Sequence, residues 1–440
     1  MKKVIFLSNM EQKDLFEDDK FTGLENTDNT VIIEPPSRLR RTFTALRYRN
    51  YRLWFWGQMT SLLGTWMQIT AQGFLIYELT HSPVFLGYVG FAAGIPSWLF
   101  MLYGGVIADR FPKRDILLIT QVVMMVLAAI LAVFTFLNII QPWEIVVLAF
   151  LLGITNAFDA PSRQAFVNEL VDREDLTNAI ALNSTMFNTA TATGPAIAGI
   201  TYALFGPAWC FTINAVSFIG IIIALRKMKM KEFVPRKRNR STFEELKEGV
   251  HYVFTHPVIR TIVILVGIIS VFGLSFATLL PAWAVKILGG DATTNGFLQS
   301  ARGVGALSSA LFIASLGRFK FKGKLLTIGS FGFPALLVVF SFIHWLPFSL
   351  LALIGLGASL ILVFNIANAL IQTLVTDDLR GRVMGVYTFT FFGFMPIGSL
   401  IMGTLAEHFG EPTAVITGAI VTLSVAISIF IFMPSIRKLH

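Results

Sequence analysis

Residues 104–114 read Gly-Gly-Val-Ile-Ala-Asp-Arg-Phe-Pro-Lys-Arg, and they join two long apolar stretches, 84–108 and 115–140. Each stretch is long enough to cross the roughly 30 Å hydrocarbon core of a bilayer as an α-helix, which rises about 1.5 Å per residue. One acid and three basic residues lie in the six positions 109–114 that lead from one stretch to the next. The pattern predicts two membrane-spanning helices joined by a short basic turn.

Apolar stretches of the same kind recur along the chain from residue 53 to residue 433. We count twelve: 53–78, 84–108, 115–140, 143–168, 176–204, 208–226, 258–286, 292–316, 324–345, 347–374, 381–408 and 412–433. The sequence therefore predicts an all-α integral membrane protein with twelve transmembrane helices.

The composition excludes an ordinary soluble enzyme. Hydrophobic residues make up 55% of the chain and charged residues 14%, against about 25% charged residues in a soluble domain. The single cysteine, Cys210, permits no internal disulfide and no thiol cluster for zinc. The sequence also has no Gly-x-x-x-x-Gly-Lys phosphate loop, no His/Cys/acid cluster and no nucleophile–base pattern. We expect no enzyme activity, no catalytic residues, no cofactor and no metal.

The basic residues determine the orientation in the membrane. The net charge of +9 would indicate nucleic acid as a partner of a soluble protein. Here, 33 of the 35 Lys and Arg residues fall on one side when the amino terminus is placed inside, and the exceptions are Lys286 and Arg302. The positive-inside rule then places both termini in the cytoplasm and leaves no role for nucleic acid.

A long basic loop divides the twelve stretches into two sets of six. The predicted organisation is a disordered acidic and basic cytoplasmic tail, a first six-helix bundle, a cytoplasmic linker, a second six-helix bundle and a cytoplasmic C-terminus: 1–44, 45–226, 227–257, 258–434 and 435–440. Within the linker, Ser241 and Glu244 form a capping box that precedes apolar residues at helical spacing. This pattern predicts an amphipathic helix on the inner membrane surface, and a plain linker is an equal alternative.

The two sets of six stretches show traces of an internal repeat. Two glycines of the second stretch recur 209 residues later, and two of the fifth recur 204 residues later: Gly87 and Gly94 as Gly296 and Gly303, and Gly194 and Gly199 as Gly398 and Gly403. In the fourth stretch we pair Asn156 with Asn365 at an offset of 209, which places a five-residue gap after that stretch. Two parallel six-helix repeats are a known transporter design.

Several motifs carry a resemblance to a known family. Residues 104–114 resemble the cytoplasmic-loop signature of the major facilitator superfamily, Gly-x-x-x-Asp-Arg followed by basic residues, with Pro112 where Gly is usual. Three motifs resemble its branch of bacterial drug and siderophore exporters, which includes enterobactin exporters and macrolide efflux pumps: Asn50–Trp54, Asp159–Ala165 and Gly194–Gly199. The resemblance covers residues 45–434. It implies a multi-pass transporter in the inner membrane of a bacterium.

The motif Gly194-Pro195-Ala-Ile-Ala-Gly199 resembles the antiporter signature Gly-Pro-x-x-Gly-Gly, with Ala198 in place of the first closing Gly. The resemblance implies close helix packing at Gly194, Pro195 and Gly199.

The resemblance also implies a gate at the cytoplasmic end. Asp159 and Arg163 lie four residues apart and therefore share one helix face. In the superfamily such a pair meets the Asp-Arg of the second helix and closes the inside of the outward-open state. The predicted gate comprises Gly105, Asp109, Arg110, Lys113, Arg114, Asp159 and Arg163. A static ion pair between helices is the alternative.

Arg302 is the residue that most directly indicates a substrate site. It lies eleven residues beyond Asp291, about 16 Å into the bilayer at helical rise. An unpaired charge at that depth is costly, so we expect the side chain to face a water-filled cavity between the two bundles. There it would attract an anionic substrate. A structural arginine bonded to neighbouring carbonyls is the alternative.

Polar residues at helical spacing extend this predicted cavity. The first stretch carries a polar stripe at Gln58, Ser61, Thr65, Gln68 and Gln72, which lipid would not tolerate. We expect five amide side chains to line the cavity beside Arg302: Gln68, Gln72, Asn156, Asn188 and Asn365. Interhelical packing is the alternative for each of them.

The function predicted from these features is secondary active transport by a monomer. We expect export of an amphipathic organic solute, a drug or a siderophore, by alternating access and proton antiport. No carboxylate lies near the midplane, so the proton would be carried by Asp159, Asp109 or Glu78, unless the substrate carries it. An uptake or facilitative carrier for a small organic anion and a transport-inactive scaffold or sensor are the alternatives.

Overall fold

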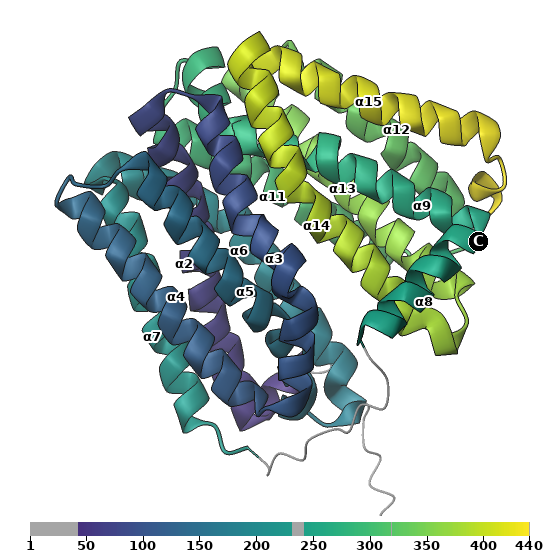
Figure 1. The fold of residues 1–440 in the computed structure, drawn as a ribbon, viewed down its shortest axis with the longest axis horizontal. Coiled ribbons are helices and arrows are strands. Elements are labelled where there is room, and N and C mark those ends of the chain that lie inside the picture. Colours follow the sequence, from purple (N-terminus) through teal and green to yellow (C-terminus); the bar gives the residue numbers. More distant parts are fainter. Residues whose placement is uncertain (1–42, 231–241, 318, 440) are drawn as a thin grey trace, which may run out of the picture. The chain divides into compact units, whose positions relative to one another are not determined.

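The structure is a computed structural model that describes residues 43–230, 242–317 and 319–439 (Figure 1). All regular elements in this part of the chain are helices, as the sequence predicts. Helices satisfy their backbone polar groups internally, which suits a chain surrounded by lipid. Residues Phe43–His440 make up one compact unit. The predicted tail up to residue 42, the basic run 236–240 and Ser241 lie outside the described residues.

The first half of the chain forms six long helices. They follow the 3₁₀ turn η1 (Thr44–Arg47) and include the turn η2 (Arg173–Asp175): α2 (Arg49–Thr80), α3 (Pro83–Arg110), α4 (Lys113–Phe136), α5 (Pro142–Leu170), α6 (Leu176–Phe205) and α7 (Pro207–Lys227). Proline begins α3, α5 and α7, where its missing N–H costs no hydrogen bond. Gly206, with φ of +88°, allows the sharp turn between α6 and α7.

The second half begins with a short helix and an irregular segment. These elements are α8 (Thr242–Thr255), α9 (Pro257–Ile268), the π turn η3 (Ile269–Gly273), the 3₁₀ turn η4 (Leu274–Leu279), α10 (Leu280–Ala282) and the π turn η5 (Trp283–Ile287). Five long helices and a final turn follow: α11 (Ala292–Ser315), α12 (Lys322–Ser341), α13 (Leu346–Leu374), α14 (Asp377–Phe409), α15 (Glu411–Phe432) and η6 (Ile436–Lys438).

Ten helical segments in the described residues are long and apolar enough to cross a membrane. They correspond to ten of the twelve predicted stretches. The other two stretches form α2 and α6, which are long helices but carry many Gln, Asn, Ser and Thr side chains. The membrane character is therefore confirmed for ten stretches, and the count of twelve spans stays a prediction.

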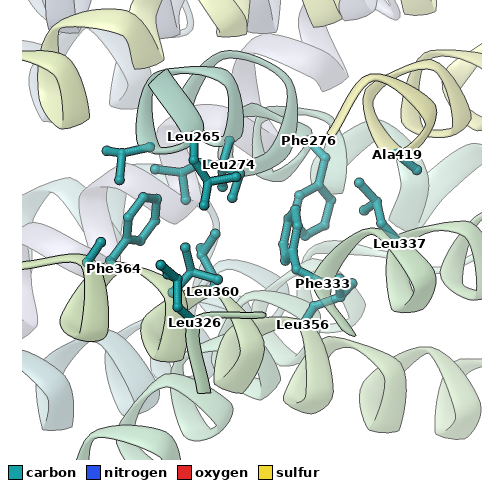
Figure 2. Close-up of a cluster of buried hydrophobic side chains, with 14 of the residues drawn as sticks. Leu265, Leu274, Phe276, Leu326, Phe333, Leu337, Leu356, Leu360, Phe364 and Ala419 are labelled. Atoms are coloured by element: carbon teal, nitrogen blue, oxygen red, sulfur yellow. The ribbon is translucent and has the colours of Figure 1, made fainter. Parts of the chain in front are cut away.

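Each half of the chain has a hydrophobic core of its own. The core of the second half draws only on residues from Val253 to Ile436. Figure 2 shows part of it, where Phe276 of η4 lies against Phe333 of α12 with ring centroids 6.4 Å apart. A separate core in the first half draws on residues from Ala45 to Met228.

The helix predicted in the linker is present as α8, but its apolar face packs on protein. Val253 is 3% exposed and belongs to the core of the second half. Glu248 pairs with Arg382 of α14 at 2.6 Å, and a Cβ atom on Gly249 would lie 2.7 Å from the Arg382 carbonyl oxygen. One face of α8 therefore packs on the second half of the protein, and its placement on the membrane surface stays a prediction.

Small residues join the two halves along two pairs of helices, α3 with α14 and α6 with α11 (Figure 1). A Cβ atom on Gly87 would lie 2.8 Å from the Ser399 carbonyl oxygen, and one on Gly199 would lie 2.6 Å from the Ala292 carbonyl oxygen. We call these contacts the two glycine seams. The backbones approach so closely that any side chain would push them apart.

The seams have a direction along the helices. The turns rich in Lys and Arg, such as those after Arg110 and Lys227, define the basic end of the helices, and the turns after Thr80 and Phe205 define the opposite end. Gly87 and Gly199 both lie within two turns of the opposite end. The seam between α3 and α14 continues to the middle of the helices, where a Cβ atom on Gly94 would collide with the ring of Pro396.

The helix bounds correct the predicted repeat in the fourth stretch. Helices α5 and α13 match end to end at an offset of 204, from 142–170 to 346–374, whereas an offset of 209 would run past the end of α13. The five-residue gap therefore falls before the fourth stretch, and pairing Asn156 with Asn365 is wrong. Weak polar matches in apolar helices cannot fix the register, whereas helix bounds can.

Candidate gate and substrate site

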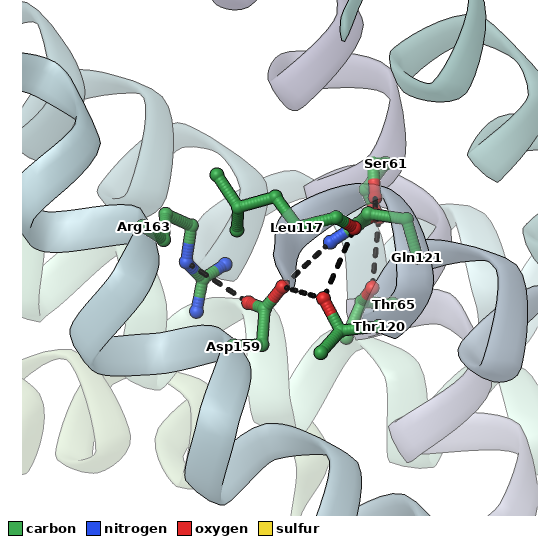
Figure 3. Close-up of polar contacts among 7 residues, drawn as sticks. All are labelled: Ser61, Thr65, Leu117, Thr120, Gln121, Asp159 and Arg163. Atoms are coloured by element: carbon green, nitrogen blue, oxygen red, sulfur yellow. Dashed lines mark hydrogen bonds and ion pairs between the residues drawn. The ribbon is translucent and has the colours of Figure 1, made fainter. Parts of the chain in front are cut away.

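A buried carboxylate cluster centres on Asp159 of α5 (Figure 3). The residue is 1% exposed. Its Oδ1 accepts hydrogen bonds from Thr120 Oγ1 and Gln121 Nε2, both at 2.9 Å, and its Oδ2 pairs with Arg163 Nε at 3.4 Å. A buried charge is tolerated only with such partners. The predicted pairing of Asp159 with Arg163 is thus present, and α4 completes it.

The Asp159 cluster reaches a third helix. Ser61 of α2 donates to Gln121 Oε1 at 3.4 Å, so hydrogen bonds link α2, α4 and α5 (Figure 3). The sequence analysis identified Ser61 in a polar stripe but missed Thr120 and Gln121. Their signal was available, because two adjacent polar residues in the apolar stretch 115–140 need protein partners in a membrane.

The other predicted gate residues lie at the basic ends of α3 and α4. Asp109 is half-buried and Arg110 is exposed in the last turn of α3. Lys113 pairs with Glu169 of α5 at 2.6 Å, and Arg114 pairs with its neighbour Asp115 at 3.2 Å. Helices α4 and α5 are thus linked through Asp159, before Arg163 in the chain, and through Glu169, after it. A link from Asp109 and Arg110 to the Asp159 cluster stays a prediction.

The glycine that packs at this end is Gly104, one residue before the predicted one. A Cβ atom on Gly104 would collide with the carbonyl oxygen of Ala157 in α5, whereas a Cβ on Gly105 would meet no heavy atom within 4 Å. Gly105, the glycine of the loop signature, therefore has no close packing contact in this conformation.

The motif at Gly194, Pro195 and Gly199 lies at close helix contacts. Gly194 faces α2, where its Cβ would lie 2.7 Å from the Trp66 Cβ. Pro195 and Gly199 face α11, where a Cβ on Gly296 would lie 2.5 Å from the Pro195 carbonyl oxygen. The motif thus joins α6 to one helix of its own half and to one of the other half.

The five predicted amide side chains do not converge on one contact. Asn214 of α7 donates a hydrogen bond to Gln68 Oε1 of α2 at 2.6 Å, so Gln68 takes part in packing between helices. Gln72, also on α2, is buried. Asn188 donates to the Ser184 carbonyl oxygen of its own helix at 2.8 Å. Asn156 is half-buried and Asn365 is exposed.

Arg302 lies in the middle of α11, against α13. A Cβ atom on Gly357 would collide with the carbonyl oxygen of Arg302, so the two backbones touch at this level. The side chain is half-buried, and its Nε is buried without a hydrogen-bond partner. The same helix face carries Asn295 and Gln299, which the sequence analysis missed although they precede Arg302 by seven and three residues.

Polar contacts also close the opposite end. Ser82, just before α3, donates to Glu407 of α14 at 2.6 Å, and Lys286 pairs with Glu411 at 3.0 Å. Tyr202 of α6 donates a hydrogen bond to Glu78 of α2. In the described residues, no three His, Cys, Asp or Glu side chains gather where they could hold a metal ion.

Comparisons with known proteins match this architecture along most of the chain. Residues 40–439 match the family model described as transmembrane secretion effector. The chain is 29% identical over 352 residues to a staphyloferrin A transporter of Staphylococcus aureus, covering 79% of this chain and 87% of the relative. It is 23% identical to the multidrug efflux pump Tap of Mycolicibacterium fortuitum, covering 87% and 95%.

A solved structure shows the same fold at lower identity. The nucleoside transporter NupG superposes with a TM-score of 0.70 at 13% identity, covering 88% of this chain and 100% of that chain. The family match and the relatives confirm the predicted resemblance to drug and siderophore transporters. The family consists of transporters rather than enzymes. The chain is a multi-pass membrane transporter that belongs to the transmembrane secretion effector family of the major facilitator superfamily.

Proposed function

We propose that this protein exports an amphipathic organic solute, a drug or a siderophore, across the inner membrane of a bacterium by alternating access coupled to proton antiport. The observation that carries the proposal is the similarity, over most of both chains, to a staphyloferrin A transporter and a multidrug efflux pump. One relative is named for staphyloferrin A and the other for drugs, so we take an organic solute as the substrate class.

The architecture proposed for this activity is twelve spans in two parallel six-helix repeats. The two glycine seams support this architecture, because the residues of one seam correspond to those of the other at the repeat offsets of 209 and 204 residues. Gly87 approaches Gly403 with a Cβ-to-Cα distance of 3.4 Å, and their counterparts Gly296 and Gly199 approach with 3.0 Å. A pair of equivalent contacts is what a pseudo-two-fold axis between the halves produces.

The structure is consistent with an inward-open state if the basic end faces the cytoplasm, as the positive-inside rule expects. The glycine seams and the Ser82–Glu407 hydrogen bond then close the outer side. In this reading the solute enters from the cytoplasm, and both termini lie there.

The proposed gate works through the Asp159 cluster. In the outward-open state the basic ends of the halves close, and Asp109 and Arg110 join Asp159 and Arg163. Protonation of Asp159 would remove the charge that holds Arg163 and so weaken this closure. Asp159, Asp109 and Glu78 are the proposed proton carriers, and Asp159 is the one whose carboxylate is already shared between helices. We further propose that the protein acts as a monomer.

The direction of transport is tested in cells. Deletion of the gene is expected to raise the intracellular accumulation of the exported compound in a panel of drugs and siderophores, measured by mass spectrometry. Re-expression of the wild-type chain restores the low level. Lower accumulation in the deletion strain would instead identify an uptake carrier.

Coupling is tested in proteoliposomes loaded with a transported dye. Efflux is expected to accelerate when an inward proton gradient is imposed, and Asp159→Asn is expected to lose that acceleration. Asp377→Asn serves as the matched control, because Asp377 pairs with Arg380 at an exposed site. Equal efflux of the wild type with and without the gradient would identify a facilitator.

A further inference from the structure

A polar face on α11 contains side chains that the fold itself leaves without partners. Asn295, Gln299 and Arg302 follow one another at spacings of four and three residues, so they share one side of the helix. We call them the α11 polar face. Asn295 is 0% exposed and Gln299 is 8% exposed, whereas Arg302 is half-buried. The face therefore runs from the fully buried Asn295 to the half-buried Arg302.

Arg302 has no counter-charge within the described residues. Its Nε is buried and unpartnered, and its side chain makes no hydrogen bond, ion pair or ring contact within the described part of the chain. A guanidinium carries five N–H donors in a planar fork that matches a carboxylate or phosphate group. The structural alternative, in which Arg302 binds neighbouring carbonyls, is thus not what the structure shows.

The buried acids of the described residues are already engaged elsewhere. Asp159 pairs with Arg163 and Glu411 pairs with Lys286. A buried cation without a partner is costly, so a site that keeps one gains most from an anionic ligand that arrives from outside. Asn295 repeats the pattern, since both its Nδ2 and its Oδ1 are buried without hydrogen bonds.

Arg302 lies beside the seam that joins the two halves. The seam between α6 and α11 extends from Gly199 and Gly296 to Gly303, where a Cβ would lie 2.6 Å from the Thr191 carbonyl oxygen. Arg302 is next to that last tight contact, and the side chains beyond it, Phe187 and Leu311, are exposed. The arginine is thus adjacent to a tight contact between the halves, with the unpartnered amide of Asn295 about 10 Å away along the helix.

We propose that the α11 polar face is the substrate anchor and that the substrate is an amphipathic organic anion, whose carboxylate or phosphate-like group binds Arg302 while a further polar group reaches Gln299 and Asn295. This inference rests on the proposed function and specifies its substrate class. A cationic drug would be repelled by the unpaired guanidinium.

The first experiment measures binding of two xanthene dyes of opposite charge, carboxyfluorescein and tetramethylrhodamine methyl ester, to the full-length protein in nanodiscs by fluorescence anisotropy. Arg302→Gln is expected to weaken carboxyfluorescein binding at least about tenfold, because a charge-assisted contact is lost. Arg302→Lys should retain part of it, and binding of the cationic ester should not weaken. Arg260→Gln, which removes a positive charge at an exposed position, is the matched control.

The second experiment separates binding from structure by thermal unfolding without ligand. Asn295→Leu replaces a buried unpartnered amide with an apolar side chain of similar size, so it is expected to maintain or raise the melting temperature while it reduces carboxyfluorescein efflux. A lower melting temperature together with unchanged efflux would show that Asn295 serves the fold and would remove it from the anchor.

The outcomes distinguish this inference from the proposed function. Wild-type protein that fails to bind carboxyfluorescein, or binds it as tightly after Arg302→Gln, overturns the anion anchor. Proteoliposomes that export the cationic ester regardless of Arg302 would retain the exporter and reject only the anionic substrate. Wild-type protein that binds carboxyfluorescein but never moves it outward would retain the anchor and reject the exporter.

Discussion

At the scale of single residues, the described part of the chain contains a buried charge with partners, Asp159, and a half-buried charge without one, Arg302. Asp159 is a buried carboxylate with three partners on two helices, and it is stable because each oxygen has a donor. Arg302 is a cation with none in the described residues. The first arrangement serves the fold and the proposed gate, and the second is open to a ligand.

The paired charge leads to a prediction about stability. Asp159→Asn places an amide donor opposite Thr120, Gln121 and Arg163, which are donors themselves, so we expect a loss of about 2–3 kcal/mol. Thermal unfolding in detergent measures it. Asp377→Asn, at a carboxylate 86% exposed, should change stability by less than about 0.5 kcal/mol. Equal effects of the two substitutions would contradict the buried network.

At the scale of helices, small residues decide which elements can approach. The glycine seams bring α6 against α11 and α3 against α14 at distances that exclude a Cβ atom. The sequence shows where the glycines are, but a glycine in an apolar helix is common and does not identify its partner. Gly105 illustrates the difference, because the loop signature includes it and the packing at this level uses Gly104 instead.

The seams predict a selective effect of added volume. Gly296→Val forces α6 and α11 apart at the Pro195 carbonyl oxygen, so we expect it to open the opposite end and to reduce efflux at least about tenfold. Gly385→Val on α14 introduces the same side chain where a Cβ meets nothing within 4 Å. Efflux from proteoliposomes measures both. Similar efflux from the two variants would show that the seam carries no conformational role.

At the scale of the whole molecule, the proposed mechanism requires the two halves to separate at the opposite end. Each half has a core of its own, and the contacts that must break lie between α3 and α14, between α6 and α11, and in a smaller apolar cluster that joins Phe74 of α2 to Ala282 and Ala292 of the second half. These contacts combine glycines and a hydrogen bond with large side chains, since Trp98 of α3 stacks on Phe389 of α14 with ring centroids 5.2 Å apart. Opening of this interface therefore exposes apolar surface as well as breaking polar contacts.

A pair of crosslinks tests this motion in a Cys210→Ala background. Gly90→Cys with Ser399→Cys joins the halves where a Cβ on Gly90 would lie 2.7 Å from the Ser399 Cβ. Gly57→Cys with Ala224→Cys joins α2 to α7 within one half at 3.2 Å. Oxidation should stop transport in the first pair, reversibly on reduction, and leave the second active. Transport that continues through the first crosslink would rule out alternating access at this end.

The extent of sequence-based prediction differed between features. Apolar length and the positions of Lys and Arg are local properties, so they predicted the helices and an orientation without reference to any contact. The repeat register failed in the fourth stretch, because isolated matches such as Asn156 with Asn365 carry little information in a biased composition. The amide side chains failed for a related reason, since a polar residue in a membrane helix needs a partner but does not specify it.

The sequence by itself determined that this is a helical membrane protein of the major facilitator type, because hydrophobic length, charge placement and the Asp109–Arg110 and Asp159–Arg163 motifs are readable along the chain. Only the tertiary structure decided which polar groups have partners. Gln68 is bound to Asn214, Asp159 is held by Thr120 and Gln121, and Arg302 is left without a partner among the described residues. That outcome depends on how neighbouring helices rotate and approach, which a single helix sequence does not contain.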